Sequence, residues 1–271
     1  MTIPKIALDS GHGLKTAGKQ TPDGIKEWEL NDKVRDKVTA ILSDYVCEII
    51  HTDGNEGNTD ETLATRVSRY INAGTSAFVS MHHNALTGKW NNATGVEVFT
   101  DRNPIPADTQ LANAIYKRLV EYTGLKGRGV KAEAWYVINQ NRIPAVLVEG
   151  GFMDSNIDYK VITSDAGQTA YAKAVAEGLI EFLDLKKKTT ATASPTIENK
   201  GSFTPYKVKV ICSALNIRKT PKWADSDVVG VIKDYGTYTI IDEKYVGSTK
   251  FGKLKSGAGW ISLGSTYVKK V

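Results

Sequence analysis

The sequence has 271 residues, of which 41% are hydrophobic, and its formal net charge is +5. This length and composition indicate a globular protein with a sizeable core, built as one large domain or two smaller ones. No apolar run approaches the roughly 20 residues of a membrane-spanning helix, and the N-terminal MTIPKIALDSGHG lacks the basic start and apolar core of a signal peptide. We therefore expect a chain made in the cytoplasm without a signal peptide.

Short apolar runs alternate with helical patterns in the first two thirds of the chain. Strands are expected at residues 5–9, 46–51, 77–82, 95–100 and 145–149. Helices are expected where apolar residues recur at three- and four-residue spacing, at residues 29–42, 62–72, 108–122 and 168–183. The alternation predicts an α/β domain, with a mostly parallel sheet flanked by helices on both faces.

A stretch poor in large apolar residues, residues 186–204, divides the chain into domains 1–185 and 205–271. Its Thr, Ser, Ala and Lys residues are typical of a solvated linker. After it the pattern changes to short β runs separated by turns, at residues 207–211, 215–218, 228–232, 238–242, 259–262 and 266–269. These runs predict a small all-β barrel.

The two predicted domains differ in charge. Residues 1–185 carry 19 basic and 24 acidic residues, whereas residues 205–271 carry 12 basic and 5 acidic residues. An excess of basic residues favours an anionic partner such as nucleic acid, a membrane or an anionic cell wall, and a solvated lysine-rich face fits the charge equally well. Cys47 and Cys212 lie far apart in apolar runs, so we expect buried free thiols.

Four side chains are expected to meet at one edge of the sheet, because open α/β sheets bind ligands beyond the C-terminal ends of their strands. His12 follows the first strand, His82 ends the third and Glu149 ends the fifth. Glu27 lies just before or at the start of the first helix. Two imidazoles and a carboxylate are a usual ligand set for catalytic zinc, and the remaining carboxylate would accept a proton from water and deliver it to a leaving amine.

Simpler interpretations of these residues remain open at this point. A histidine at a strand end is more often a hydrogen-bonded loop residue than a ligand, and a glutamate at a helix start is usually a favourable partner of the helix dipole. Side chains alternate along a strand, so only one of His82 and His83 can face the site, and the pattern does not say which.

Residues 3–184 resemble the zinc-dependent N-acetylmuramoyl-L-alanine amidases of the amidase-3 type, found in bacterial autolysins, sporulation enzymes and phage endolysins. The matching motifs, in order, are IALDSGHG (6–13), IKEWELN (25–31), TLATRVSRYINAG (62–74), FVSMHHNA (78–85), GVEVF (95–99), GLKGRGV (124–130) and PAVLVEGGFMDSNID (144–158).

The resemblance implies that His12, Glu27 and His82 bind Zn²⁺ and that Glu149 is the catalytic carboxylate of an enzyme that cleaves the amide between N-acetylmuramic acid and L-alanine. The family pattern places the ligand histidine two residues before an asparagine, which selects His82 and leaves His83 at a variable position. The spacing to the following Leu-Asn pair likewise selects Glu27 over Glu29. Two departures are Leu14, where a second glycine is common, and His51, where an arginine is frequent.

Residues 205–271 resemble bacterial SH3-like cell-wall-binding domains through ALNIRKTP (214–221), VVGVIKDYGTYTII (228–241), GWISL (259–263) and YVKKV (267–271). Tyr206, Trp223 and Tyr245 are candidate groove aromatics, and each fits the barrel core equally well. The implied partners are bacterial peptidoglycan and associated anionic wall polymers, Gram-positive in type, with neither nucleic acid nor membrane.

Two rival functions are a zinc carboxypeptidase or endopeptidase that acts on the stem peptide, and a wall- or nucleic-acid-binding protein whose catalytic domain is inactive. The intact set of four site residues argues against the second. The absent signal peptide favours a phage or prophage endolysin, which acts on the cell wall after its release, over a secreted autolysin.

Overall fold

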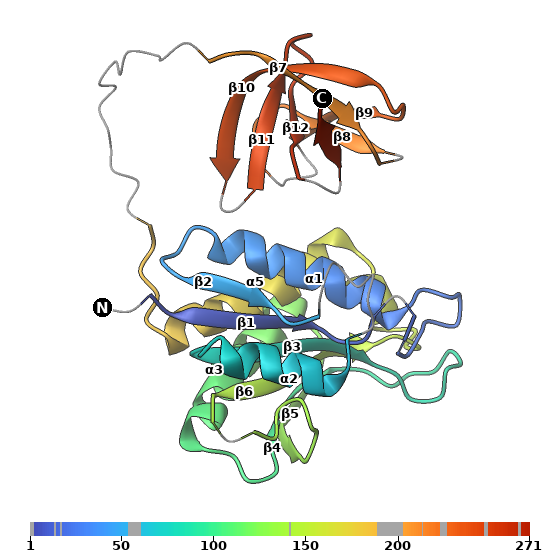
Figure 1. Cartoon of the computed structure of the whole chain (residues 1–271). Helices are drawn as coiled ribbons and strands as arrows, with labels where there is room; N and C mark the ends of the chain where they lie inside the picture. The colour runs from blue at the N-terminus through green and yellow to red at the C-terminus, as the bar shows by residue number, and fades with distance from the viewer. Residues whose placement is uncertain are drawn as a thin grey trace. The chain divides into compact units, whose positions relative to one another are not determined.

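A computed structural model of the chain divides into two compact units, Met1–Lys188 and Thr189–Val271 (Figure 1). The first unit includes residues 186–188, which the composition assigns to the linker, because backbone hydrogen bonds join Lys186 and Lys188 to Val46 and Asp44. The structure describes residues 3–13, 15–16, 18–53, 61–140, 142–188, 203–212, 214–222, 227–246, 249–264 and 267–271.

A mixed sheet forms the centre of the first unit, with the strand order β2-β1-β3-β6-β4-β5 as far as the structure describes the chain. Its strands are β1 (Lys5–Ser10), β2 (Glu48–His51), β3 (Ala77–Asn84), β4 (Val96–Asp101), β5 (Gly127–Glu133) and β6 (Ala145–Phe152). β2, β1, β3 and β6 run parallel, whereas β4 is antiparallel to β6 and β5 is parallel to β4. The α/β prediction is confirmed, with a mixed sheet.

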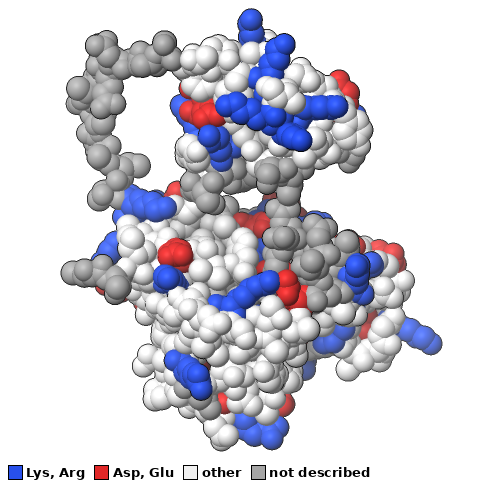
Figure 2. All heavy atoms as spheres, viewed as in Figure 1, with Lys and Arg blue, Asp and Glu red and all other residues white. Residues whose placement is uncertain are grey.

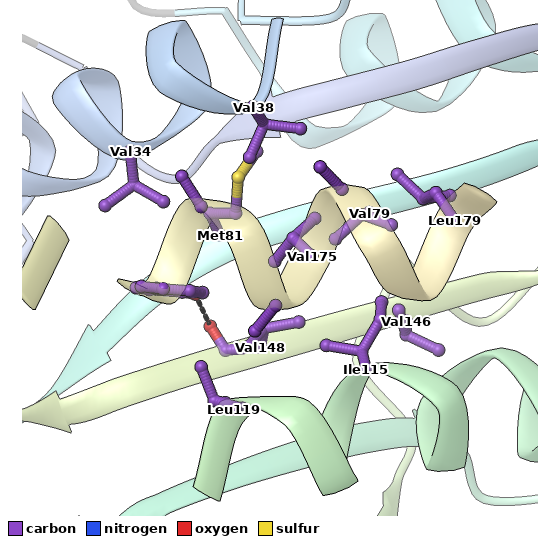
Figure 3. Packing of buried hydrophobic residues seen from close by; sticks show 14 of the residues in the cluster. Val34, Val38, Val79, Met81, Ile115, Leu119, Val146, Val148, Val175 and Leu179 are labelled. Atoms are coloured by element: carbon purple, nitrogen blue, oxygen red, sulfur yellow. Dashed lines mark hydrogen bonds between the residues drawn. The ribbon is translucent and has the colours of Figure 1, made fainter. Parts of the chain in front are cut away.

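The helices cover the two faces of this sheet unequally. They are α1 (Glu27–Leu42), α2 (Leu63–Asn72), α3 (Pro106–Thr123), α4 (Tyr159–Ile162) and α5 (Asp165–Phe182). α1, α3 and α5 pack on one face, which we call the helical face, around a large apolar core. In Figure 3, Val38 of α1 lies beside Met81 of β3, and Ile115 of α3 lies near Val146 of β6.

α2 contributes to a smaller core on the opposite face of the sheet. Because side chains alternate along each strand, Val79 and Met81 of β3 enter the large core, whereas Phe78 enters the small one. Ser80 and His82 share the face of Phe78. We call this face the polar face, because at the C-terminal ends of β1, β3 and β6 it carries ionisable side chains instead of an apolar core.

The second unit is an antiparallel sheet with the order β13-β7-β10-β11-β12-β8-β9 within the described residues, which confirms the all-β prediction. The strands are β7 (Tyr206–Val210), β8 (Leu215–Arg218), β9 (Val228–Ile232), β10 (Thr237–Val246), β11 (Thr249–Leu254), β12 (Trp260–Ser262) and β13 (Val268–Lys270). Val210, Ile240 and Ile261 lie at the centre of its core. Tyr206 packs partly against this core, Tyr245 is exposed, and Trp223 lies outside the described residues.

The structure also bears on the two cysteines, on two strands that were not expected, and on membrane-spanning helices. Cys47 and Cys212 are free thiols as expected, but both are only partly buried, because each lies at the end of a strand and not within it. β5 and β11 were not predicted, since glycines and lysines interrupt their apolar patterns. Among the described residues, no helix is long and apolar enough to cross a membrane.

Candidate active site

The loop after β1 brings His12 to the edge of the sheet through an unusual backbone conformation. His12 has a φ of 70°, in the left-handed region that non-glycine residues rarely adopt. Its neighbour Gly11 lies against the ring of His82, where a Cβ on Gly11 would come within 2.1 Å of the imidazole. Only glycine therefore allows the β1 loop to approach β3 this closely.

Three of the four predicted site residues meet at this point. The potential ligand atoms of His12, Glu27 and His82 all lie within 4.8 Å of one another. Nδ1 of His82 is 2.9 Å from Oε1 of Glu27, and Nε2 of His12 is 3.2 Å from Oε2 of the same carboxylate. Two imidazole nitrogens and a carboxylate oxygen are a suitable donor set for a divalent transition metal.

Glu27 is the first residue of α1, where the helix dipole favours a negative charge. Its buried carboxylate accepts hydrogen bonds from the backbone N–H of Lys19, at 2.8 Å, and of His83, at 3.2 Å. Burial acts to raise the pKa of Glu27, but hydrogen bonds from His12 and His82 hold it well below its usual value. The carboxylate is therefore ionised and fixed in place.

His83 occupies the opposite face of β3 from His82. It is buried, and its Nδ1 lies 2.8 Å from Oδ1 of Asn31 on α1. Burial lowers the pKa of His83 to about 4, so its ring is neutral. Asn31 in turn donates to the carbonyl of Gly11, at 3.1 Å. His83 thus ties α1 to β3 beneath the site, and it is not among the clustered ligand atoms.

Glu149 lies in β6, in register with His82 of β3. The residue is only 5% exposed, and its Oε2 has no hydrogen-bond partner among the described residues. Burial and the negative charge of Glu27 raise the pKa of Glu149 to about 8. This carboxyl group can therefore exchange a proton near neutral pH, unlike Glu27.

Beneath the β1 loop lies a buried ion pair that the sequence patterns did not reveal. Arg66 of α2 donates from Nη1 to Oδ1 of Asp9, at 2.6 Å, and from Nη2 to the carbonyl of His12. Asp9 also accepts hydrogen bonds from Ser80, at 2.7 Å, and Thr52, at 2.8 Å. Arg66 thus supports the strained backbone of His12. The available signal was two polar residues, Asp9 and Ser80, inside apolar strands.

A groove lies beside the cluster of His12, Glu27 and His82, since Gly18 of its wall lies against His12 and Glu27. Its volume is about 540 Å³, and it lies between the loop after His12 and the loop after β3. Asp154 fixes the second loop by accepting hydrogen bonds from the backbone N–H groups of Leu86, Thr87 and Gly88. The groove is lined by Gly18, Lys19, Gln20, Thr21, Pro22, Gly24, Ala85, Leu86 and Gly88.

His51, at the end of β2, contacts Thr39 and takes no part in the cluster.

Comparison with known proteins gives one consistent answer. The family model Amidase_3, described as N-acetylmuramoyl-L-alanine amidase, matches residues 6–181. The endolysin of Bacillus phage SPP1 is 32% identical over 269 residues, which cover 97% of this chain and 97% of that protein. The amidase LytC of Bacillus subtilis (strain 168) is 29% identical over 178 residues, covering 65% of this chain and 35% of LytC.

The catalytic unit also has a similar solved structure. The catalytic domain of CwlV, an N-acetylmuramoyl-L-alanine amidase from Bacillus (Paenibacillus) polymyxa var. colistinus, aligns with a TM-score of 0.62 and 28% sequence identity. The alignment covers 68% of this chain and 99% of that domain. The family match over residues 6–181 includes His12, Glu27, His82 and Glu149. By its family match, its relatives and its fold, this chain belongs to the Amidase_3 family of N-acetylmuramoyl-L-alanine amidases.

Proposed function

We propose that this protein is a zinc-dependent N-acetylmuramoyl-L-alanine amidase of the phage endolysin type. It hydrolyses the amide bond that joins N-acetylmuramic acid to the L-alanine of the peptidoglycan stem peptide. The observation that carries the proposal is the convergence of three potential metal ligands and a buried carboxyl group of raised pKa on one edge of the sheet. Family membership supports the substrate class, and the similarity to a phage endolysin over nearly the whole chain supports the endolysin role.

His12, Glu27 and His82 would hold the zinc ion. Their two imidazole nitrogens and one ionised carboxylate match the three protein ligands of catalytic zinc sites, which keep one position open. The pKa of Glu27, held well below its usual value, keeps this ligand ready to bind a cation without releasing a proton. When bound, zinc supplies Lewis-acid chemistry, which polarises a carbonyl and lowers the pKa of water.

Glu149 would move the proton in the reaction. A general base works best when its pKa lies near the working pH, and burial raises the pKa of Glu149 to about 8 from the ordinary value near 4.3. Its unpartnered Oε2 accepts a proton from the attacking water. It then donates this proton to the alanine nitrogen as the carbon–nitrogen bond breaks, which leaves a free lactyl carboxylate and a free L-alanine amine.

Glu149→Gln tests this assignment, because the amide keeps the shape of the side chain but cannot act as a base. We expect a loss of activity of about 10²- to 10⁴-fold, with zinc still bound at one ion per chain. Mass spectrometry of digested cell wall measures the new L-alanine amines, and Glu29→Gln, at a half-buried position in the first turn of α1, is the control. Wild-type activity in Glu149→Gln would contradict the proposal. Release of stem-peptide fragments without new L-alanine amines would favour the carboxypeptidase or endopeptidase alternative.

For the second unit, our proposal is an SH3-like domain that binds the anionic cell wall. Its basic composition supports this role, and Figure 2 shows Lys and Arg side chains gathered on one face of the unit. Lys207 and Lys209 of β7 are exposed, and Lys209 pairs directly with the exposed Lys269 of β13. Like charges in direct cross-strand pairs repel each other, so this arrangement favours an anionic ligand. Exposed Tyr245 is the groove aromatic that best fits a wall contact.

Deletion of residues 189–271 separates the two proposed roles. The first unit has its own core, so we expect the truncated protein to hydrolyse soluble muropeptides at close to the full-length rate. Its binding to intact cell wall, measured by sedimentation with wall fragments, should fall at least tenfold. The triple variant Lys207→Gln, Lys209→Gln, Lys269→Gln in the full-length chain should reproduce part of that loss. Unchanged wall binding by both proteins would contradict the binding role.

A further inference from the structure

Four ionisable side chains stand in one row across the polar face of the sheet, on four neighbouring strands. His82 of β3 is in register with Glu149 of β6, and Glu149 is in register with Glu97 of β4. Residues in direct cross-strand register have side chains on the same face. Arg128 of β5 completes the row, since its side chain reaches Glu97. The row therefore begins at the metal-ligand cluster and ends at a cation.

A bulge in β5 aims Arg128 at this row. Val96 of β4 pairs with Gly127, but Val98 pairs with Val130, so two residues of β5 lie opposite the single residue Glu97. Gly129, the second of them, has a φ of 99°, which glycine adopts without strain. Such bulges redirect side chains and are frequent next to active sites.

Glu97 binds two cations at the same time. Its carboxylate is only 3% exposed, and its Oε2 accepts hydrogen bonds from Nε of Arg128, at 3.0 Å, and from Nζ of Lys131. Its Oε1 accepts one from Nδ2 of Asn84, at 3.0 Å. One negative charge thus holds two positive charges, and the cluster keeps a net positive charge beside the proposed catalytic carboxylate.

The two cations remain accessible from solvent. The side chains of Arg128 and Lys131 are 35% and 40% exposed. Arg128 is held by Nε and by the ring of Phe152, whose centroid lies 4.9 Å from the guanidinium carbon. Among the described residues its two Nη atoms have no hydrogen-bond partner. A guanidinium fixed in this way presents a fork of two N–H groups that matches the geometry of a carboxylate.

We propose that Arg128 and Lys131 form a subsite for a carboxylate of the stem peptide. The inference rests on the proposed amidase function and adds the direction in which the peptide leaves the catalytic centre, toward β5. Neighbouring strands are about 4.8 Å apart, so about 10 Å separates the backbone of Glu149 from that of Arg128. Three extended residues span that distance at about 3.5 Å each, and two suffice because the Arg128 side chain reaches back toward Glu97 of β4.

The chemistry of the stem peptide fits this spacing. L-Alanine follows the scissile amide, and the next residue is D-glutamate joined through its side chain, so its α-carboxylate is free unless it is amidated. The simplest alternative is an ion-pair cluster that only neutralises buried Glu97 and touches no substrate. In that case the two cations would stabilise the sheet without distinguishing a carboxylate from an amide.

The decisive measurement compares two soluble muropeptides that differ only in this group, one with D-isoglutamate and one with its α-amide, D-isoglutamine. We expect the full-length zinc-loaded enzyme to prefer the free carboxylate by about tenfold or more in kcat/KM, mainly through KM, because a hydrogen bond between two charged groups is worth at least that factor. In Arg128→Gln the preference should disappear, and in Lys131→Gln it should shrink. The control is Arg102→Gln, an exposed arginine at the end of β4, which should keep the preference.

The preference is a ratio measured on one protein, so a partly unfolded variant lowers both rates and leaves the ratio intact. Equal kcat/KM values for the two muropeptides in the wild-type enzyme would overturn the subsite. A preference that survives in Arg128→Gln would do the same and would leave only the ion-pair role. If the wild-type enzyme cleaves neither muropeptide at the muramic acid–alanine amide, the proposed function fails first, which is a distinguishable result.

Discussion

The same strands form both faces of the six-stranded sheet, but one face carries an apolar core and the other carries polar and ionisable side chains. On the helical face, Val79, Met81 and Val148 pack with three helices into a continuous apolar core (Figure 3). On the polar face, the same strands present Ser80, His82 and Glu149, and α2 covers part of the surface together with residues 137–138 of the segment after β5. A rigid apolar face allows the other face to hold charges at fixed positions.

Three carboxylates of the polar face are nevertheless nearly as buried as the apolar residues of the helical face. Asp9, Glu97 and Glu149 are each at most 5% exposed, yet each has a different environment. Asp9 is paired with Arg66, Glu97 has two cations, and Glu149 has an unpartnered oxygen. Burial alone therefore does not separate the proposed catalytic carboxylate from the two paired ones. Among these three side chains, the unpartnered oxygen and the raised pKa of Glu149 do.

The largest expected difference between the faces concerns the adjacent histidines of β3. His82→Ala should abolish zinc binding and lower activity at least about 10²-fold, because it removes a proposed metal ligand. His83→Ala should keep one zinc ion per chain, because its ring lies on the opposite face and its backbone N–H still reaches Glu27. Metal analysis of the purified proteins measures both. The reverse result would shift the proposed ligand register by one residue.

A second comparison removes a charge partner from the polar face. Arg66→Met leaves Asp9 buried without its counter-charge, which should lower the free energy of unfolding by about 3–5 kcal/mol. Urea denaturation measures the change. Arg69→Met, on the same helix but paired with a partly exposed Glu61, should lower it by about 1 kcal/mol or less. Equal effects of the two substitutions would show that the buried pair has no special role.

The smallest effect concerns His51, which lies at the end of β2 beside Thr39. Burial, followed by the charge of Arg35, lowers the pKa of His51 to about 4, with Asp36 opposing the shift. The unfolded chain then binds the proton at higher pH than the folded chain, so stability is lost as pH falls from about 6.5 toward 4.

Between pH 7 and pH 5 this residue should lower the free energy of unfolding by about 2 kcal/mol. His51→Gln should remove that part of the pH dependence, measured by urea denaturation at the two pH values. The difference between variant and wild type isolates His51 from the carboxylates and from His83, which titrate in both proteins. A variant as pH-dependent as the wild type would contradict the low pKa.

Much of the fold could be predicted from the periodicity of apolar residues. The strand at residues 215–218 and the strand at residues 228–232 have the predicted bounds, and the four predicted helices begin and end within a few residues of the expected positions, whereas the short helix α4 was not predicted. β5 and β11 were not predicted, because their own residues show no strand pattern. They are strands because they pair with the neighbouring strands β4 and β10. The roles of His12, Glu27, His82 and Glu149 stay predictions, although the structure places all four at one edge.

By itself, the sequence determined which polar side chains lie near the C-terminal ends of the strands, because each follows an apolar run. His82 and Glu149 lie within the last residues of β3 and β6, which run on to Asn84 and Phe152. The tertiary structure alone decided the chemical state of those side chains. Glu27 and Glu149 are the same residue type, yet one has a lowered pKa and the other a raised one, because their partners come from distant segments. The reversal of β4 likewise sets Glu97 beside Glu149, with Arg128 on the far side of Glu97, because strand order and direction depend on packing across the whole domain.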